Sequence, residues 1–227
     1  MDRQIVCFAI PSLEIALVRL GHPQLRTRPL AVATLDTPRA LIREISPEAE
    51  RDGLHIGMPP DRARRLCPSL QVRLPNPHQV ATATHSIFGV IQRYAPTWEP
   101  LLPGSLLMDL TGTTRLFGTA CDVATKIQTE VLTQFHLEGA AGVGSNKLVA
   151  QTAATLIAPS ELYDVRSGSE RLFMSPLSIR ALPGVHRPCM RTVLKRLDDL
   201  NLCSLGDVAD SPLEALEVAL GTYAGQL

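Results

Sequence analysis

The fold is decided by the stretch Pro100-Leu101-Leu102-Pro103-Gly104-Ser105-Leu106-Leu107-Met108-Asp109-Leu110. Apolar runs flank Pro103-Gly104, a dipeptide that marks a tight turn, so the stretch predicts a β-hairpin with strands over residues 98–102 and 106–110. The corner residues Gly104 and Ser105 carry no carboxylate. Divalent metal ions that catalyse phosphoryl transfer are held mainly by carboxylate oxygens, so this corner offers no such ligand.

The hairpin lies within a pattern of strands and helices that is typical of an α+β fold. Residues 5–10 form a continuously apolar, partly β-branched run, which predicts a strand in the middle of a sheet that ends at Pro11. Apolar periodicity then predicts the elements around the hairpin, namely helices over 80–94, 122–133 and 147–157 and a strand over 137–143. Ser145 is the expected N-cap of the helix over 147–157.

Two other regions have a different pattern. Between the first strand and residue 74, Ser12 is the expected N-cap of a helix, and the sequence predicts strands over 30–33 and 40–45 and short helices near residues 47 and 61. From residue 182 onward, short helical segments surround Leu182-Pro183-Gly184-Val185-His186. This arrangement predicts a helix-hairpin-helix unit near the end of the chain.

Composition limits the classes of function. The 22 basic and 22 acidic side chains cancel, so no overall field attracts nucleic acid, and any such partner must be bound by local patches. The five cysteines are spread out and form no C-x-x-C pair, so the sequence indicates neither a disulfide framework nor a zinc site. No apolar run approaches the ~20 residues of a membrane span, and we expect a soluble, cytoplasmic protein without membrane contact.

Short motifs in a fixed order carry a resemblance to a known family. They are HPQLR (22–26), RPLAV (28–32), GLHIGMP (53–59), LCPSL (66–70), MDLTG (108–112), RLFG (115–118) and GVGSNK (142–147). Together they resemble the Y-family translesion DNA polymerases of UmuC and DinB type, and more closely the catalytically degenerate, ImuB-like mutasome proteins. Pro11 and the Leu-Phe-Gly element at 116–118 are typical of that branch.

The resemblance implies that the metal-binding carboxylates are missing. Active members place one Asp at the end of the first strand and an Asp-Glu pair at the hairpin corner, and the aligned positions here are Ala9, Gly104 and Ser105. The resemblance therefore implies no catalytic residue, no metal site and no cofactor in this chain.

The resemblance also implies that the nucleotide contacts are gone. The aromatic residue that guards the sugar aligns near Glu14, the Tyr and Arg that hold the triphosphate align with Pro47 and Glu50, and a later phosphate-binding lysine aligns with Ala158. A negative Glu50 would repel the phosphates that a polymerase attracts.

The expected architecture is an α+β polymerase-like right hand. The resemblance implies a palm over residues 1–11 and 75–165, fingers over 12–74 and a helix-hairpin-helix thumb over 166–227, with the little-finger domain absent. In the thumb, backbone amides at a helix start and a basic helical face would contact DNA phosphates in a sequence-independent way. The expected DNA-binding residues are Gly184, Val185, His186, Arg187, Arg191 and Lys195. The alternative is a packing motif with a solvated basic face.

We therefore expect a non-catalytic protein that binds DNA weakly and acts as an adaptor in translesion synthesis and DNA repair. The resemblance implies three protein partners: a separate catalytic translesion polymerase of replicative type, a RecA-like companion and the sliding clamp. One alternative is an active translesion polymerase with unconventional metal ligands, for which Glu99 and Asp109 are the nearest surviving acids. Another is a simple helix-hairpin-helix DNA-binding module on a scaffold.

Overall fold

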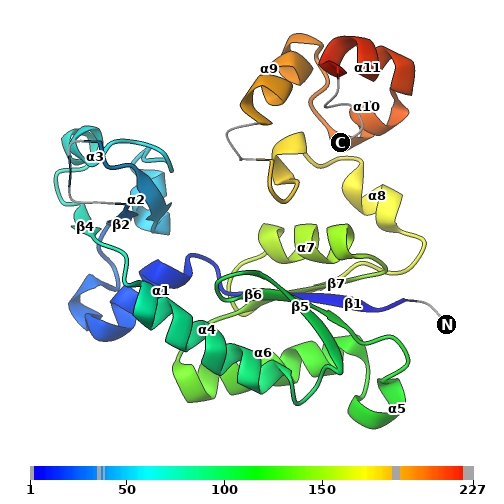
Figure 1. Cartoon of the computed structure of the whole chain (residues 1–227), viewed down its shortest axis with the longest axis horizontal. Helices are drawn as coiled ribbons and strands as arrows, with labels where there is room; N and C mark the ends of the chain where they lie inside the picture. Colours follow the sequence, from blue (N-terminus) through cyan, green and yellow to red (C-terminus); the bar gives the residue numbers. More distant parts are fainter. Residues whose placement is uncertain (1–2, 35–36, 38, 186–189, 222–227) are drawn as a thin grey trace.

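The computed structural model describes residues 3–34, 37, 39–185 and 190–221. Two β-sheets and a group of helices at the C-terminal end make up this part of the chain (Figure 1). The first sheet has five strands in the order β5-β6-β1-β7-β8, and the second has three strands in the order β3-β2-β4. The bounds of the strands are β1 Ile5–Ala9, β2 Leu30–Ala33, β3 Ile42–Ile45, β4 Gln71–Arg73, β5 Thr97–Leu102, β6 Ser105–Asp109, β7 Ala140–Gly144 and β8 Leu162–Asp164.

Strand β1 lies in the middle of the five-stranded sheet, as the sequence predicts. It pairs antiparallel with β6 on one side and with β7 on the other, and β7 pairs in parallel with β8. Side chains alternate across the strand, so Val6 and Phe8 enter the core on one face while Ile5 and Cys7 enter the core on the other. Burial on both faces explains why this strand is apolar throughout.

Helices cover both faces of this sheet (Figure 1). On one face lie α4 (Pro77–Ile91) and α6 (Ala120–Phe135), which share a core with Val6 and Phe8. On the other face lies α7 (Lys147–Leu156), where Ala150 and Ala154 pack against Ile5 and Cys7. Small residues on α7 and β7 let this helix approach the sheet closely.

The closest approach occurs at Gly142 of β7. A Cβ atom there would lie 2.2 Å from the carbonyl oxygen of Ala150 and 2.5 Å from the amide nitrogen of Ala154. Both atoms belong to the backbone of α7 and do not move independently of the helix. Gly142 therefore sets the distance between α7 and the sheet.

The three-stranded sheet has its own core. In it, β2 pairs antiparallel with β3 and parallel with β4. Between β3 and β4 the chain forms α2 (Pro47–Arg51) and α3 (Pro60–Leu66), and the core contains Ala31, Ile42, Ala49, Leu54, Met58 and Ala63. The helix α1 (Leu13–Gly21) and the 3-10 helix η1 (Pro23–Leu25) connect this unit to β1.

The C-terminal end of the described chain is helical. It contains α8 (Glu170–Met174), the 3-10 helix η2 (Ile179–Ala181), α9 (Arg191–Asp199), α10 (Leu205–Asp210) and α11 (Leu213–Leu220). Ile179, Val185, Val193, Leu197 and Leu220 form the centre of its separate core. One further short helix, α5 (Thr114–Phe117), follows the hairpin.

Of the two predicted helix caps, Ser12 is confirmed in position but makes no side-chain cap, and Ser145 is wrong. Ser12 adopts a left-handed conformation, with φ of 48°, and its hydroxyl caps nothing; the Glu44 carboxylate instead accepts the Glu14 and Ile15 amides at 3.0 and 3.2 Å. Asn146, not Ser145, caps α7 through its side-chain oxygen, which accepts the Val149 amide at 2.9 Å. In both places an acceptor that better fits the first turn replaces the serine hydroxyl.

Some elements also differ in extent from those predicted. The strand expected over 137–143 begins at Ala140, and β8 and α8 were not predicted. Because β8 has only three residues and lies at an edge of the sheet, its sequence carries little periodic signal. Within the described residues, no helix combines the length and apolar character needed to cross a bilayer.

Substituting Gly142→Ala should lower the free energy of unfolding by about 2–3 kcal/mol, because the methyl group meets backbone atoms of α7. The matched control is Gly89→Ala in the interior of α4, where a Cβ would meet nothing within 4 Å. That change should raise the free energy of unfolding by about 0.5–1 kcal/mol, since alanine favours helix. Urea denaturation of both variants measures the difference, and equal effects would contradict the close approach.

Candidate functional site

The structure brings Ala9, Gly104 and Ser105 together at one end of the five-stranded sheet. Ala9, the last residue of β1, lies directly opposite Ser105, the first residue of β6. One residue further on, the Ile10 amide donates a hydrogen bond of 3.0 Å to the Gly104 carbonyl oxygen. Ala9 thus forms a single corner with Gly104 and Ser105, which lie far from it in the sequence, and none of the three side chains carries a carboxylate.

The polar atoms at this corner are poor metal ligands. The Ser105 hydroxyl makes a hydrogen bond with the Cys7 thiol. Burial raises the pKa of that thiol to about 12, and the hydrogen bond with Ser105 lowers it only in part. Hard ions such as Mg²⁺ prefer oxygen ligands, so the buried Cys7 thiol is a poor ligand for them.

The two acids that the sequence offers as alternative metal ligands, Glu99 and Asp109, are engaged elsewhere. Asp109 is four residues along β6 from Ser105, roughly 13 Å away at the usual rise of a strand. Its carboxylate accepts the Thr111 amide at 3.0 Å and lies 3.6 Å from Nε of Arg3. Partial burial raises the pKa of Asp109, but the hydrogen bonds with Thr111 and the charge of Arg3 outweigh it, and the pKa lies below its ordinary value.

Glu99, on β5, forms an ion pair with Lys147 at the start of α7. Across all the residues that the structure describes, no group of three or more His, Cys, Asp or Glu side chains is placed to hold a metal ion. In the described structure Glu99 and Asp109 line one small cavity together with Arg3 and Lys147, and each acid is paired with one of these basic side chains.

An apolar side chain occupies the space beside the corner. Leu13, the first residue of α1, is buried, and its Cδ2 atom lies 2.9 Å from the position that a Cβ atom on Gly104 would take. Gly104 itself has φ of +72°, a conformation that residues with a side chain rarely adopt. An acidic residue at position 104 would thus be strained and would collide with Leu13.

Glu14 links α1 to the three-stranded sheet. It is only 7% exposed, and its Oε1 lies 2.7 Å from a guanidinium nitrogen of Arg43 on β3. The next residue on β3, Glu44, caps α1, so β3 holds the start of α1 by two carboxylate contacts. Burial raises the pKa of Glu44, and the charge of Glu14 adds to this effect, while the amide hydrogen bonds and Arg43 oppose it.

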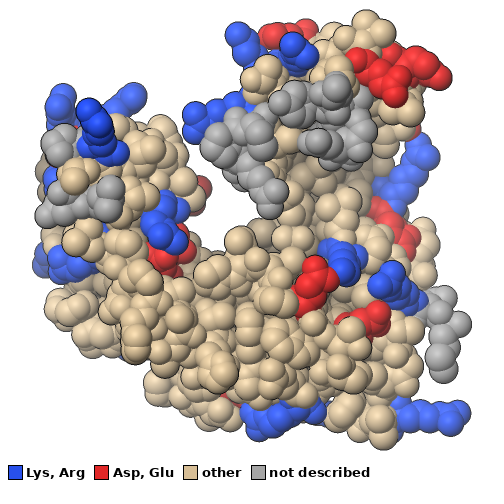
Figure 2. All heavy atoms as spheres, in the orientation of Figure 1, with Lys and Arg blue, Asp and Glu red and all other residues tan. Residues whose placement is uncertain are grey.

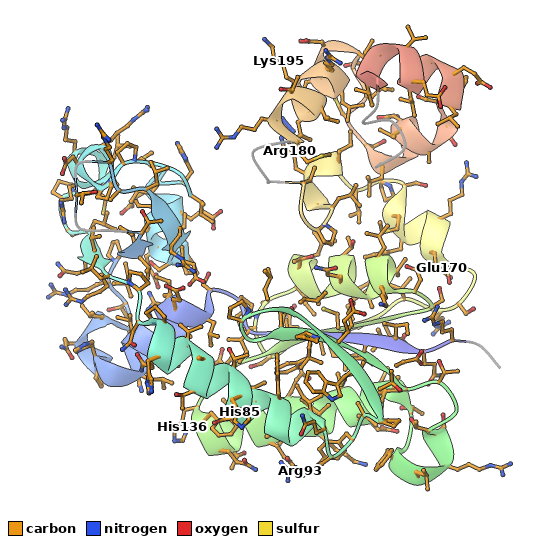
Figure 3. All side chains as sticks on the ribbon, viewed as in Figure 1. His85, Arg93, His136, Glu170, Arg180 and Lys195 are labelled. Carbon is orange, nitrogen blue, oxygen red and sulfur yellow. The ribbon has the colours of Figure 1, made fainter. Side chains whose placement is uncertain are left out.

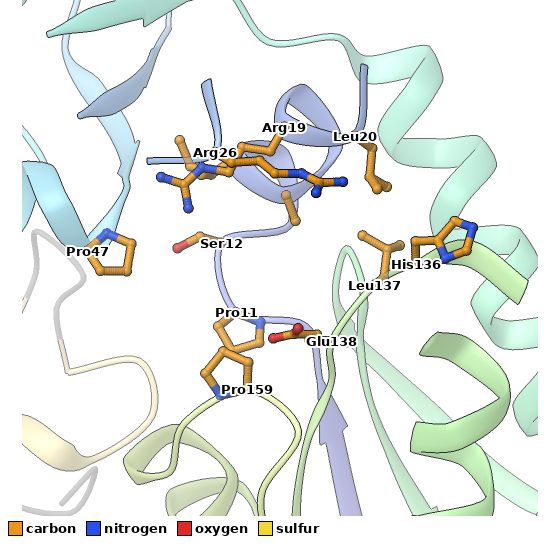
Figure 4. A pocket seen from close by; sticks show the side chains of 12 residues that line it. Pro11, Ser12, Arg19, Leu20, Arg26, Pro47, His136, Leu137, Glu138 and Pro159 are labelled. Atoms are coloured by element: carbon orange, nitrogen blue, oxygen red, sulfur yellow. The ribbon is translucent and has the colours of Figure 1, made fainter. Parts of the chain in front are cut away.

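Three prolines gather around a cavity of about 520 Å³ between α1, α2 and the loops that flank β7 (Figure 4). Pro11 follows β1, Pro47 opens α2 and Pro159 directly follows Ala158. Two of these, Pro47 and Pro159, stand at or beside positions that the resemblance assigns to phosphate contacts. Four aliphatic residues complete its apolar surface, and its polar or charged lining residues are Ser12, Arg19, Arg26, His136 and Glu138.

The sequence analysis did not identify Arg19 or Arg26. Arg19 lies on α1 and Arg26 directly follows η1, and Figure 4 shows both side chains along one rim of the cavity. Since neither residue occupies a position that active polymerases use for phosphate, only the folded chain brings them to this cavity.

The predicted DNA-binding residues lie partly outside the described chain. Gly184, with φ of +81°, and the buried Val185 form a turn after η2. His186 and Arg187 fall outside the described residues. Arg191 and Lys195 are exposed one turn apart on α9, and Lys195 projects away from the five-stranded sheet (Figure 3).

An open cleft separates the unit of the three-stranded sheet from the C-terminal helices, and the unit of the five-stranded sheet forms its floor (Figure 2). Basic side chains are prominent on the unit of the three-stranded sheet (Figure 2), and Arg62 and Arg65 of α3 are exposed. The cavity with the three prolines lies at the foot of that unit, beside α1 and α2.

Comparison with known sequences gives consistent matches. Residues 11–155 match the impB/mucB/samB family. The chain is 25% identical over 225 residues to a DNA polymerase IV of Dehalococcoides mccartyi, covering 99% of this chain and 57% of the relative. It is 31% identical over 205 residues to a DNA polymerase IV of Desulfatibacillum aliphaticivorans, covering 89% of this chain and 50% of the relative. The chain thus spans between half and three-fifths of the length of these relatives.

Solved structures show the same fold. DinB from Sulfolobus solfataricus superposes with a TM-score of 0.86 at 21% identity, over 98% of this chain and 64% of that one. The insertion ternary complex of Dbh DNA polymerase superposes with a TM-score of 0.85, also at 21% identity, over 98% of this chain and 65% of that one. These likenesses confirm the predicted α+β fold of Y-family polymerase type.

Gly104→Ala should lower the free energy of unfolding by about 1–3 kcal/mol, through backbone strain and the contact with Leu13. Gly53→Ala is the matched control, because Gly53 has a similar φ of +81° and open space around it. It should show the strain alone, about 1 kcal/mol.

Combining Gly104→Ala with Leu13→Ala separates the contact from the strain. The double variant should lose less stability than the sum of the single variants, by about 0.5–3 kcal/mol, because the collision disappears. Additive losses in denaturant titrations would show that Leu13 does not occupy the space beside Gly104.

Proposed function

The chain belongs to the impB/mucB/samB family, within the Y-family DNA polymerase superfamily, and from this membership we propose that it is a non-catalytic, DNA-binding adaptor in translesion synthesis and DNA repair. One observation carries the proposal. Where a two-metal centre needs converging carboxylates, the corner of Ala9, Gly104 and Ser105 offers none, and Leu13 packs beside Gly104. Among Y-family proteins this pattern fits the ImuB-like branch.

We assign the units of the fold to parts of a polymerase hand. Residues 1–11 and 75–165 correspond to the palm, residues 12–74 to the fingers and residues 166–227 to the thumb. The three main cores support this division, and α1 joins the fingers to the palm because its Leu13 and Leu17 are buried in the palm core. On this assignment the corner lies in the palm, at the foot of the cleft where a polymerase would join nucleotides.

The contacts of Glu14 and the prolines argue against nucleotide binding. Glu14 is paired with Arg43, also in the fingers, so its carboxylate holds α1 against β3 and would place a negative charge where active members have an aromatic residue. Pro47 has no phosphate-binding group, and the negative Glu50 on the same helix disfavours a triphosphate. No lysine precedes Pro159, because Ala158 takes that place.

DNA contact is proposed for the thumb. The turn at Gly184 and Val185 leads toward α9, whose Arg191 and Lys195 are exposed and, within the described chain, form no ion pair. His186 and Arg187 complete the proposed set. Such a surface would bind phosphates weakly and without sequence preference. The adaptor would then work with a separate catalytic polymerase, a RecA-like companion and the sliding clamp.

The names of the relatives favour one alternative, an active translesion polymerase. Such an enzyme would need unconventional metal ligands. Because Glu99 pairs with Lys147, and Arg3 and Thr111 hold Asp109, neither acid is free to join a centre at the corner.

Primer extension distinguishes the adaptor from the enzyme. We expect no nucleotide incorporation by the purified chain with either Mg²⁺ or Mn²⁺, whereas the DNA polymerase IV of Dehalococcoides mccartyi should extend the same primer as a positive control. The reason is that no carboxylate at the corner can hold the metal ions. Robust incorporation that Asp109→Ala abolishes would overturn the proposal.

A salt titration of primer-template binding tests the thumb surface. The double variant Arg191→Ala/Lys195→Ala should bind several-fold more weakly at low salt, and its slope of log affinity against log salt should be smaller by about 1.8, because two phosphate contacts are lost. The charge-matched control is Arg62→Ala/Arg65→Ala on α3, which should leave the slope nearly unchanged. An equal loss in both variants would show that α9 is not the DNA contact.

A further inference from the structure

The cavity with the three prolines keeps a charged rim although the residues expected for phosphate contact are absent. Its volume of about 520 Å³ lies in the range of ordinary ligand sites. Ile15, Leu20 and Leu137 contribute aliphatic walls, to which Pro11, Pro47 and Pro159 add further apolar surface. Such walls favour an apolar ligand, while the charged residues select its polar groups.

Arg19 has an incomplete set of hydrogen-bond partners. One guanidinium nitrogen lies 2.6 Å from the Glu48 carboxylate and 3.4 Å from the Arg28 carbonyl oxygen. Its Nε is buried, and no acceptor among the described residues contacts it. The guanidinium is otherwise partly exposed, so an incoming acceptor would be stabilised there.

Arg26 is exposed on the same rim and, within the described residues, lies within ion-pair distance of no carboxylate. Its guanidinium is therefore free to bind an anionic group from outside the chain. Arginine presents a planar set of donors that matches a carboxylate in two parallel hydrogen bonds.

Glu138 limits what kind of anion fits. Figure 4 shows its carboxylate beside Pro11, across the cavity from Arg19 and Arg26. The three charged lining residues sum to one positive charge, two guanidinium groups against one carboxylate. A triphosphate brings several negative charges and no donor, so Glu138 would repel it, whereas a peptide brings one carboxylate and backbone amides that donate.

We propose that this cavity holds an Asp or Glu side chain of a short, extended segment of a partner protein. The segment's carboxylate binds Arg26 and the partly exposed guanidinium of Arg19, its backbone amides donate to Glu138, and its aliphatic neighbours contact the apolar walls. This inference rests on the proposed function in one respect, because it requires that nucleotide no longer uses the cavity. On this proposal, the cavity where an active polymerase would bind its nucleotide instead binds a protein partner of the adaptor.

The experiment uses the full chain with ¹³C-labelled Ile and Leu methyl groups. The probe is a blocked pentapeptide, acetyl-Ala-Leu-Glu-Leu-Ala-amide, and its partner probe has Gln in place of Glu. The Glu peptide should give saturable shifts of the Ile15 and Leu137 methyl signals. The Gln peptide should bind at least about fivefold more weakly than the Glu peptide, since it lacks the charge-assisted contact.

Arg26→Ala should weaken binding of the Glu peptide by about fivefold or more, and it should remove most of the difference between the two peptides. Arg28→Ala is the matched control: it removes an equal charge from an exposed residue two positions away that does not line the cavity. That variant should bind both peptides as the unchanged chain does.

Three other results of these titrations would contradict the proposed peptide site. If the Glu peptide gives no saturable shift, or if Arg28→Ala and Arg26→Ala have equal effects, the peptide site is refuted while the primer-extension result still decides the adaptor function. If inorganic phosphate binds as well as the Glu peptide, the cavity is a general anion site and the inference is wrong. If a deoxynucleoside triphosphate with Mg²⁺ displaces the peptide, two statements are wrong: that the cavity is a peptide site, and that this chain no longer binds nucleotide there.

Discussion

Pairing of β1 with both neighbours is the constraint on which the rest of the structure depends. Its register with β6 places Ala9 opposite Ser105, and its register with β7 places Val6 opposite Val143 and Cys7 opposite Gly142. Both faces of β1 are covered, so a shift of its pairing by one residue would turn the side chains of each core toward the opposite face of the sheet. The corner, the start of α1 and the proline-lined cavity all follow from where this strand ends.

Local patterns in the sequence predict much of this fold. The apolar run at 5–10 and the Pro103-Gly104 turn identify the central strand and the hairpin, because strands buried on both faces and tight turns leave strong local signals. The start of α1 was predicted only in part. Its cap is Glu44, 30 residues away from Glu14 in the sequence, and no local pattern reports a contact between elements that far apart.

The candidate site, too, could be predicted from the sequence only in part. The missing acids at Ala9, Gly104 and Ser105 follow from motifs in the sequence, and the structure adds that the three positions share one corner. The charged rim of the cavity did not follow from any motif. Arg19 reaches its partner Glu48 across 29 residues, and Arg26 reaches the cavity only because η1 turns the chain back toward α1. Contacts of this kind depend on the folded arrangement of side chains.

The backbone at Gly104 makes the present state difficult to reverse in small steps. A single change to aspartate would combine a strained φ of +72° with a collision against Leu13, so the intermediate would lose stability before any metal ion could bind. Replacing Leu13 first would open a hole in the core without restoring a ligand. A carboxylate at this corner would therefore need changes at both Leu13 and Gly104, so the packing of one leucine limits which single substitutions the corner tolerates.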